Sequence, residues 1–264
     1  KAQANIVHNT DLTSLNGLRN VKNAHRIWIA NNAVLSSLNG FTSLENVGER
    51  LFVGANPNLV QIGVFNNLKT CKFITVDGNP QLPSFDGFPA ITTVDDIDIK
   101  NNPKLQSIAP LTTLTKLNGF LNIESTAILT GLSGLSNLTN LGGGLKIQNN
   151  PLLEHLNGLS NLVSAGGSIY IEGNKVLNDI TGLQKISPIT ISGDGLVLKN
   201  NPALSFCNLP NFCTYLSGSG KRDISGNLAN CTNEQAVINA CCRLDPPQNI
   251  TTTNANNCQV NNGS

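Results

Sequence analysis

The sequence predicts a repeat solenoid that is mostly β, a coil in which every turn adds one strand to a long parallel sheet. The first observation is the phrase Leu/Ile-x-Leu/Ile/Val-x-x-Asn-Pro-x-Leu, which returns at a nearly fixed interval. It occupies residues 51–59, 74–82, 97–105 and 145–153. Self-similarity at a period of roughly 20 to 50 residues is typical of a stacked array. We therefore expect an elongated core shared by many turns.

The second observation is that the asparagine of this phrase gives a register for almost the whole chain. It falls at Asn9, Asn32, Asn56, Asn79, Asn102, Asn150, Asn174, Asn201 and Asn227, with Thr126 in the one gap. This spacing assigns residues 1–205 to a solenoid of about nine turns, one strand per turn of about 24 residues. Because Ala4 and Ile6 already fill repeat positions, we expect that an N-terminal cap is missing.

The strand of each turn is predicted by a short alternation, as in Leu145-Lys146-Ile147. Alternation of apolar and polar residues indicates a strand with one buried face. Strands that recur once per turn must pair in parallel, about 4.8 Å apart. The asparagine after each strand is expected to bond unpaired backbone groups inside the bend and to stack into a ladder. The proline that follows suits a corner where the strand stops.

The other half of each turn carries the phrase Leu-x-Gly-Leu/Phe, read for example at residues 156–159. Here Gly158 is expected to supply backbone freedom for the next corner. Glycine links such as Gly142-Gly143-Gly144 lead into the next strand. Long helices do not fit, so short strands, turns or 3₁₀ pieces are expected.

Composition excludes some classes of partner. The chain has 17 basic and 16 acidic residues, only 12% charged, so neither sign dominates. We expect no nucleic-acid partner and no direct membrane insertion, because there is no basic footprint and no apolar run of membrane-spanning length.

The cysteines indicate an oxidising compartment. Six of the seven are crowded into the last quarter, at spacings unlike the paired ligands of zinc sites. The disulfide candidates are Cys207, Cys213, Cys231, Cys241, Cys242 and Cys258. Their pairing stays open, although a bridge between the adjacent Cys241 and Cys242 would be strained. Cys71 is the odd thiol, and the protein is expected to be extracellular, secreted or anchored at the cell surface.

The C-terminal quarter departs from the repeat. Residues 206–244 are expected to form a disulfide-stapled cap, with a last degenerate strand at residues 223–227 and one short helix. Thr232 and Gln235 fit a capping box before the apolar stretch through Ile238. Residues 245–264 are Asn- and Thr-rich and are interpreted as a linker or tail.

The combined phrase resembles that of a known family. Leu-x-Gly-Leu-x-x-Leu, a Gly-Gly link and Leu-x-Ile-x-x-Asn-Pro-x-Leu together look like the receptor L-domain class of leucine-rich-repeat proteins. The resemblance covers roughly residues 6–227. It implies a right-handed superhelix of a secreted or cell-surface protein with a cysteine-bearing C-terminal cap. It does not imply a partner, since such repeats are scaffolds whose ligands differ.

The outward face of the sheet is the first candidate for function. Its middle column should run from Trp28 and Phe52 to Tyr170, in a chain with only 5% aromatic residues. Exposed aromatic rings anchor protein and sugar partners, but they also stack across strands simply to cover a sheet. The candidate ligand-binding residues are Trp28, Phe52, Phe73, Arg26, Arg50, Asp96, Asp98 and Tyr170.

Metal binding and catalysis find little support. Asp77, Asp96 and Asp98 should gather on adjacent turns, but Lys100 lies beside them, and Asp95 should face the other side if the alternation holds. The three histidines are far apart in the register and no catalytic motif is present. We expect no enzyme activity, no cofactor and no metal.

Three functional hypotheses remain. The first is a binding module for adhesion or recognition of a protein or glycan at a cell surface. The alternative is a structural or self-assembling spacer, because an uncapped parallel sheet has an open edge. The third is a non-catalytic part of a larger enzyme or receptor kinase.

Overall fold

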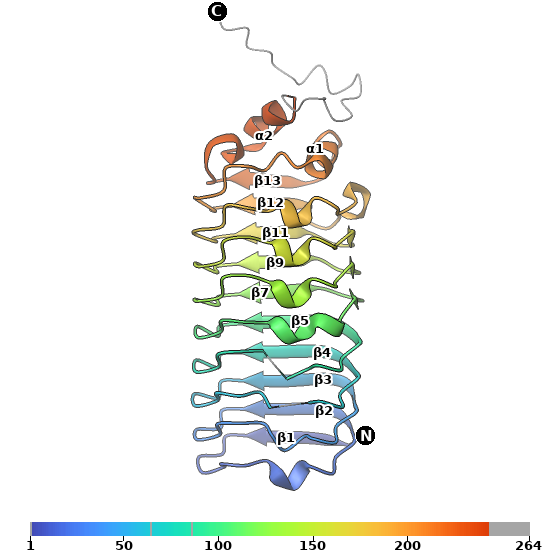
Figure 1. Ribbon diagram of the computed structural model, residues 1–264, viewed down its shortest axis with the longest axis vertical. Helices are drawn as coiled ribbons and strands as arrows, with labels where there is room; N and C mark the ends of the chain where they lie inside the picture. The colour runs from blue at the N-terminus through green and yellow to red at the C-terminus, as the bar shows by residue number, and fades with distance from the viewer. Residues whose placement is uncertain (1, 64, 86, 243–264) are drawn as a thin grey trace, which may run out of the picture.

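The computed structural model describes residues 2–63, 65–85 and 87–242. It is mostly β, with one sheet of 13 strands, and the turns stack in sequence order along the long axis (Figure 1). Among these residues there are only two α-helices, both near the C-terminal end. The expected long parallel sheet is confirmed.

Ten strands form the continuous path of the sheet, each paired in parallel with the next. They are β1 (Gln3–Val7), β2 (Asn23–Ala30), β3 (Asn46–Gly54), β4 (Thr70–Asp77), β5 (Thr93–Lys100), β7 (Leu121–Glu124), β9 (Leu145–Gln148), β11 (Ile169–Glu172), β12 (Leu196–Lys199) and β13 (Arg222–Ser225). Equivalent repeat positions lie side by side, as in the pairing of Leu51 with Ile74 and of Ile74 with Ile97. The register read from the asparagines is therefore correct.

The later turns differ from the earlier ones in strand length. From β2 to β5 the strands contain eight or nine residues. Beyond β5 the equivalent segment is divided into two pieces, the first being the short strands β6 (Lys116–Leu117), β8 (Asn140–Leu141) and β10 (Ser164–Ala165). The gaps between the pieces contain glycines such as Gly119 and Gly143, which interrupt strands because they have no side chain to pack.

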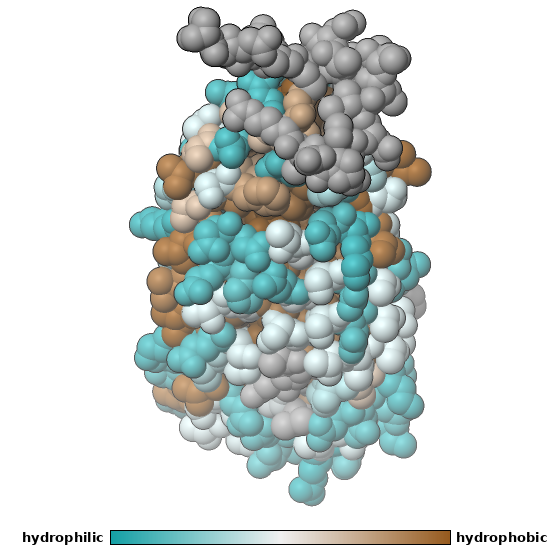
Figure 2. Space-filling model, turned by 45° about the horizontal axis from the view of Figure 1, so that its top comes forward, coloured by the Kyte–Doolittle hydropathy of each residue, from teal (hydrophilic) through white to brown (hydrophobic). Residues whose placement is uncertain are grey.

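The other side of each turn is made of loops and short 3₁₀ helices, as expected. These are η1 (Asn16–Leu18), η2 (Ala109–Thr113), η3 (Ser133–Leu135), η4 (Asn157–Leu159), η5 (Thr181–Leu183), η6 (Pro188–Thr190) and η7 (Ala229–Cys231). Figure 2 shows a mixture of hydrophilic and near-neutral side chains over the middle of this loop side. No helix in the described ranges is long and apolar enough to cross a membrane.

The role expected for Gly158 is wrong. It lies in η4, and its φ is not among the positive ones. A Cβ there would lie 2.0 Å from the carbonyl oxygen of Leu132, and Gly182 is equally close to the carbonyl oxygen of Leu156 in the turn before it. These glycines are needed because neighbouring turns approach each other too closely for a side chain.

Left-handed backbone occurs instead at the residue before each ladder position. Ten residues share this conformation, with φ between 51° and 70°. Those before the ladder are His8, Asn31, Ala55, Gly78, Asn101, Ser125, Asn149, Gly173, Asn200 and Gly226. Asparagine and glycine dominate the set because they adopt this region at little steric cost.

The core is one continuous apolar cluster between the sheet and the loop side. Each turn contributes leucine, isoleucine or valine from its strand and from the Leu-x-Gly-Leu/Phe phrase. Between β2 and β5, phenylalanines at the equivalent position of each turn stack inside the core, with ring centroids 5.7 Å apart for Phe41 and Phe65 and 5.2 Å for Phe65 and Phe88. No single turn has a core of its own, because the apolar side chains of each turn pack on those of the turns above and below.

The asparagine ladder is present and buried. In a typical step, Oδ1 of Asn79 accepts hydrogen bonds from both the backbone N–H and the Nδ2 of Asn56, each at 3.2 Å. Nδ2 of Asn79 in turn donates to Oδ1 of Asn102 and to the carbonyl oxygen of Val53, 3.1 Å away in the preceding turn. One side chain thus ties three turns together. The same pattern recurs from Asn150 to Asn227.

Thr126 changes the ladder at its middle. Its Oγ1 and N–H both donate to Oδ1 of Asn150, at 2.7 and 3.1 Å. In the direction of the N-terminus, Nδ2 of Asn102 donates to the carbonyl oxygens of Val76 and Lys100. The short threonine side chain has no amide oxygen to offer to Asn102. The ladder therefore continues downstream of Thr126 but lacks one full step upstream of it.

The C-terminal end is closed by α1 (Pro210–Leu216) and α2 (Glu234–Cys241). Disulfides join Cys207 to Cys231 and Cys213 to Cys241, and Cys242 is disulfide-bonded as well. Among the described cysteines, Cys71 is free, as expected. Cys258 and the predicted tail lie outside the described residues.

Two expectations for this end are corrected. The sequence predicted one helix, but there are two: α1 begins at Pro210, whose fixed φ suits a first helical turn, and it buries Phe212, Tyr215 and Leu216. Helix α2 is capped by Asn233, whose Oδ1 accepts from the N–H of Ala236 at 2.9 Å, so Thr232 is not the cap. The predicted last strand is confirmed as β13.

We expect Asn79→Ala to lower the free energy of unfolding by about 3 kcal/mol, because it leaves buried groups of Asn56 and Val53 unpaired. Asn58→Ala is the matched control, since Asn58 is exposed and makes only one bond to a backbone carbonyl.

We expect Thr126→Asn to raise the free energy of unfolding by about 1 kcal/mol by completing the ladder. Urea unfolding measures all three, and equal effects of the two alanine substitutions would contradict the role of the ladder.

Candidate functional site

The outer face of the sheet carries three columns of side chains, and all three follow the register predicted from the sequence. The middle column is Trp28, Phe52, Thr75, Asp98, Asn122, Lys146, Tyr170 and Val197. The column on its N-terminal side begins with Arg26, Arg50, Phe73 and Asp96. The column on its C-terminal side is Ala30, Gly54, Asp77, Lys100, Glu124, Gln148, Glu172 and Lys199.

Near the N-terminal end, Trp28 and Phe52 form a stacked aromatic pair. Their ring centroids are 4.0 Å apart and the planes differ by 13°. A Cβ on Gly54 would lie 2.5 Å from the ring of Phe52, so this ring occupies the space that a side chain at position 54 would need. Ala30, which precedes Gly54 in that column, is also small and is buried. The absence of a side chain at Gly54 leaves room for the ring of Phe52.

Arginines surround this pair. The guanidinium carbon of Arg50 lies 5.1 Å from the centroid of Phe73, and its Nη1 donates to Oγ1 of Thr75 at 3.3 Å. Arg26 is paired with Glu49, and this hydrogen bond holds the pKa of the Glu49 carboxyl below its usual range. We use the name aromatic platform for Trp28, Phe52, Phe73, Arg26 and Arg50. Phe73 belongs to it through its contact with Arg50, since the stacked ring pair of the platform is Trp28 with Phe52.

The acidic residues of the face form ion pairs or hydrogen bonds with neighbouring residues. Lys100 Nζ lies 3.3 Å from Asp98 and 3.8 Å from Asp77. Oδ1 of Asp96 accepts from the backbone N–H of Phe120 at 2.8 Å, and burial raises the pKa of this carboxyl above its ordinary value. Across the residues that the structure describes, no three His, Cys, Asp or Glu side chains come together as a metal site.

The expectation that Asp95 faces the core is wrong. Val94 and Ile97 are both buried, so the two residues between them lie toward the outside. Asp95 accepts from Nδ2 of Asn118 at 2.8 Å in an exposed position. The neighbouring strand β4 has the same pattern, with Lys72 and Phe73 between the buried Cys71 and Ile74, so two consecutive outward residues replace simple alternation here.

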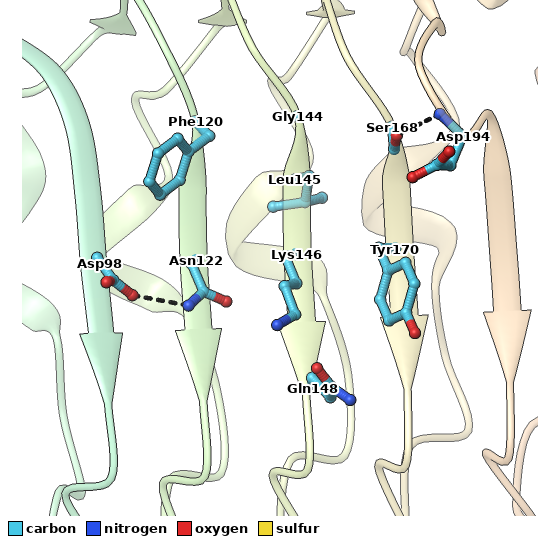
Figure 3. Close-up of a pocket in the computed structure, with 10 residues that line it drawn as sticks. All are labelled: Asp98, Phe120, Asn122, Gly144, Leu145, Lys146, Gln148, Ser168, Tyr170 and Asp194. Atoms are coloured by element: carbon cyan, nitrogen blue, oxygen red, sulfur yellow. Dashed lines mark hydrogen bonds between the residues drawn. The ribbon is translucent and has the colours of Figure 1, made fainter. Parts of the chain in front are cut away.

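A shallow pocket of about 580 Å³ lies farther along the same face. It is centred on β9, between the turns of β7 and β11 (Figure 3). It is lined by Asp98, Phe120, Asn122, Gly144, Leu145, Lys146, Gln148, Ser168, Tyr170 and Asp194. We call it the central pocket. It brings together two of the predicted residues, Asp98 and Tyr170, whereas none of the five platform residues lines it.

Hydrogen bonds fix several side chains of the central pocket. Nδ2 of Asn122 donates to Oδ1 of Asp98 at 2.7 Å, and the backbone N–H of Asp194 donates to Oγ of Ser168 at 2.8 Å (Figure 3). Lys146 Nζ donates to Glu124 at 2.9 Å. These bonds link residues from successive turns, so the rim is held by the stack as a whole.

Tyr170 is held by Glu172, two residues farther along β11. Its hydroxyl donates to the Glu172 carboxylate, and this bond, together with burial, raises the pKa of Tyr170 to about 12. The phenol is therefore neutral at physiological pH. Because the hydroxyl is anchored, the ring has a defined position beside the pocket.

The sequence placed the pocket residues in columns but did not single out the pocket. Phe120, Asn122, Lys146, Gln148 and Ser168 are ordinary members of the outward columns in the sequence. The one residue that could have indicated the pocket is Gly144. It is a glycine in an outward column, in the turn between those of Phe120 and Tyr170, and it leaves a gap in the surface. Asp194 carries no such signal because it lies in the loop before β12.

The histidines and the free thiol are distributed elsewhere. Nε2 of His25 lies 3.2 Å from Glu49, beside the platform. His155 lies on the loop side, where its Nδ1 is buried without a partner. Cys71 is in the core, only 2% exposed, and burial raises the pKa of its thiol to about 12.

Comparison of the chain with models of known protein families and with curated proteins found no match.

We expect Cys71 to resist alkylation in the folded protein. Its folded pKa of about 12 exceeds that of an unfolded thiol, about 8.5, so deprotonation favours the unfolded chain. The stabilising contribution is full below about pH 8.5 and is lost as the pH rises toward 12. Iodoacetamide at mildly alkaline pH should modify the Cys71 peptide only in denaturant, as seen by mass spectrometry. Equally fast modification without denaturant would contradict this burial.

We expect the ring pair of the platform to couple energetically. Trp28→Ala, Phe52→Ala and the double substitution form a double-mutant cycle, with a coupling of about 1 kcal/mol from the stacked geometry. Urea unfolding gives the four free energies. Strictly additive effects would mean that the two rings cover the sheet independently.

Proposed function

We propose that this chain is an extracellular, non-enzymatic binding module that recognises a protein or a glycan at a cell surface. In this proposal it is a right-handed leucine-rich-repeat solenoid of the receptor L-domain type, and the outer sheet face is its recognition surface. The observation that carries the proposal is that the platform and the central pocket share this one face, on a frame whose buried residues repeat from turn to turn.

Two features support recognition rather than chemistry at this face. First, its charged side chains are largely engaged with one another, as in the pairs of Lys100 with Asp98 and of Lys146 with Glu124. Second, the pocket combines an aromatic ring with amide and hydroxyl groups, the mixture that fixes the orientation of a bound ligand.

The C-terminal disulfides support the extracellular location. The pairs Cys207–Cys231 and Cys213–Cys241 staple the cap through two bridges in a short stretch of chain. Structural disulfides of this kind persist in oxidising compartments and are rare in the cytosol.

The alternative, a structural or self-assembling spacer, draws on the edge strand β1. It pairs with β2 on one side, and no other described strand pairs with it on the other. An edge of this kind can accept a strand of a second chain. Light scattering that shows growth in size with concentration, together with unaltered binding of face variants, would favour this alternative.

The test uses the labelled chain and intact cells of its source organism, with binding measured by flow cytometry. Two face variants remove rings: Trp28→Ala with Phe52→Ala in the platform, and Phe120→Ala with Tyr170→Ala at the pocket. We expect at least one of them to lower binding about tenfold or more, since exposed aromatic anchors dominate recognition surfaces.

The matched control is Leu152→Ala with Ile189→Ala, two exposed apolar residues away from the outer columns. This variant should bind as the unaltered chain does. Thermal unfolding of every variant shows whether the fold is intact. If both face variants bind as well as the unaltered chain, or if only the control loses binding, the outer face is rejected as the recognition surface.

A further inference from the structure

We infer that the central pocket is a binding site for a neutral carbohydrate, with Phe120 and Tyr170 as the rings on which a sugar packs. This inference rests on the proposed function and names the class of ligand for one part of the face.

The apolar elements of the site are two separated rings with an open floor. Phe120 precedes β7 and Tyr170 lies on β11, two strands away, with about 10 Å between the two strands. The strand between them presents Gly144, so no side chain fills the space beside Phe120 (Figure 3). Phe120 is 41% exposed, the largest exposed ring surface on this part of the sheet. A saturated sugar ring has apolar C–H faces that pack against aromatic rings of this kind.

The polar elements include an acceptor with no partner. Asn122 is only 8% exposed, and its Oδ1 is buried without a hydrogen bond. Figure 3 shows its amide nitrogen directed at Asp98 and its oxygen directed the other way, toward the strand that carries Lys146. An unsatisfied buried acceptor is costly, and a ligand hydroxyl that enters between Asn122 and Lys146 would satisfy it. The long side chain of Lys146 is 40% exposed and can move aside.

The charges favour a neutral ligand. Of the three charged residues that line the pocket, Asp98 is paired with Lys100 and Lys146 with Glu124. The third, Asp194, offers carboxylate oxygens that accept hydrogen bonds from hydroxyls. An anionic ligand would meet the carboxylates of Asp98 and Asp194 without a free cation to compensate, whereas a polyhydroxylated ring needs only donors and acceptors.

A second depression continues the site along the stack. It has a volume of about 450 Å³ and shares Tyr170 and Asp194 with the central pocket. It extends toward Val197, Lys221 and Arg222 on the next turns. Tyr170 therefore stands between two hollows, an arrangement that suits consecutive units of an oligosaccharide running parallel to the long axis.

The aromatic platform is a weaker carbohydrate site. Trp28 and Phe52 stack on each other at 4.0 Å, so the ring faces between them are already covered. Arg50 lies over Phe73 in the same way. The rings of the central pocket have no such partner among the ring contacts of the described residues.

The experiment is a screen of neutral hexose oligosaccharides, with sulfated and uronic-acid oligosaccharides beside them, followed by calorimetric titration of the best neutral ligand. Phe120→Ala and Tyr170→Ala should each lower the affinity about tenfold, and Phe120→Tyr should retain it because the ring face is kept. A trisaccharide should bind more tightly than the monosaccharide. The affinity should be the same at low and high salt, since a neutral ligand has no charge to screen.

The matched control is Phe206→Ala. Phe206 is 43% exposed, close to the 41% of Phe120, and it lies outside the outer columns. This variant and Trp28→Ala should bind the oligosaccharide as the unaltered chain does, and thermal unfolding confirms that each variant is folded.

Several results would overturn the inference. Oligosaccharide binding that survives in both pocket variants places the sugar elsewhere. Binding restricted to acidic sugars, with a steep fall at high salt, replaces the neutral ligand by a charged one. If no oligosaccharide binds while the cell-binding assay still depends on the outer face, the carbohydrate assignment fails and the recognition surface stands. Cell binding that is unaltered in both face variants would instead reject the recognition surface itself.

Discussion

The buried asparagine ladder is the interaction on which the rest of this structure depends. A corner between strand and loop leaves backbone groups unpaired, and these groups lie too deep for water to reach. Each asparagine pairs such groups in the preceding turn: its Oδ1 accepts from the ladder asparagine of that turn and its Nδ2 donates to a strand carbonyl. Asn79 does so for Asn56 and Val53. Because the same amide serves its own corner and the adjacent one, the corners are held at the spacing of the sheet.

The ladder also explains why the outer face is free to vary. With the corners fixed and the apolar core continuous, the outward residues contribute little to the frame and can differ in every turn. The column that contains Arg50 and Phe73 continues with Phe120, Gly144 and Ser168, and this change from large to small side chains hollows the surface at β9. The central pocket is thus a consequence of side-chain size along one column, and the strand backbones beneath it keep their regular pairing.

The C-terminal end of the sheet is covered by the segment after β13, which contains η7 and α2. Disulfides tie this cover to the segment after β12 and to α1. Asn227 extends the ladder into the cover, since its Nδ2 donates to the carbonyl oxygens of Leu198 and Cys231. Stack and cover are therefore joined by the same kind of bond that joins the turns.

The sequence by itself determined the period, the parallel sheet, the ladder and the outward columns, because all of these follow from which residue types recur about every 24 positions. Tertiary structure decided the features that depend on contacts between turns. The outward position of Asp95, the close approach at Gly158, helix α1 and the Asn233 cap each depend on a neighbour distant in sequence or on backbone geometry that no period encodes. The central pocket belongs to this second group: Phe120, Gly144 and Tyr170 are ordinary members of three turns, and only the lateral packing of those turns leaves an open floor between two rings.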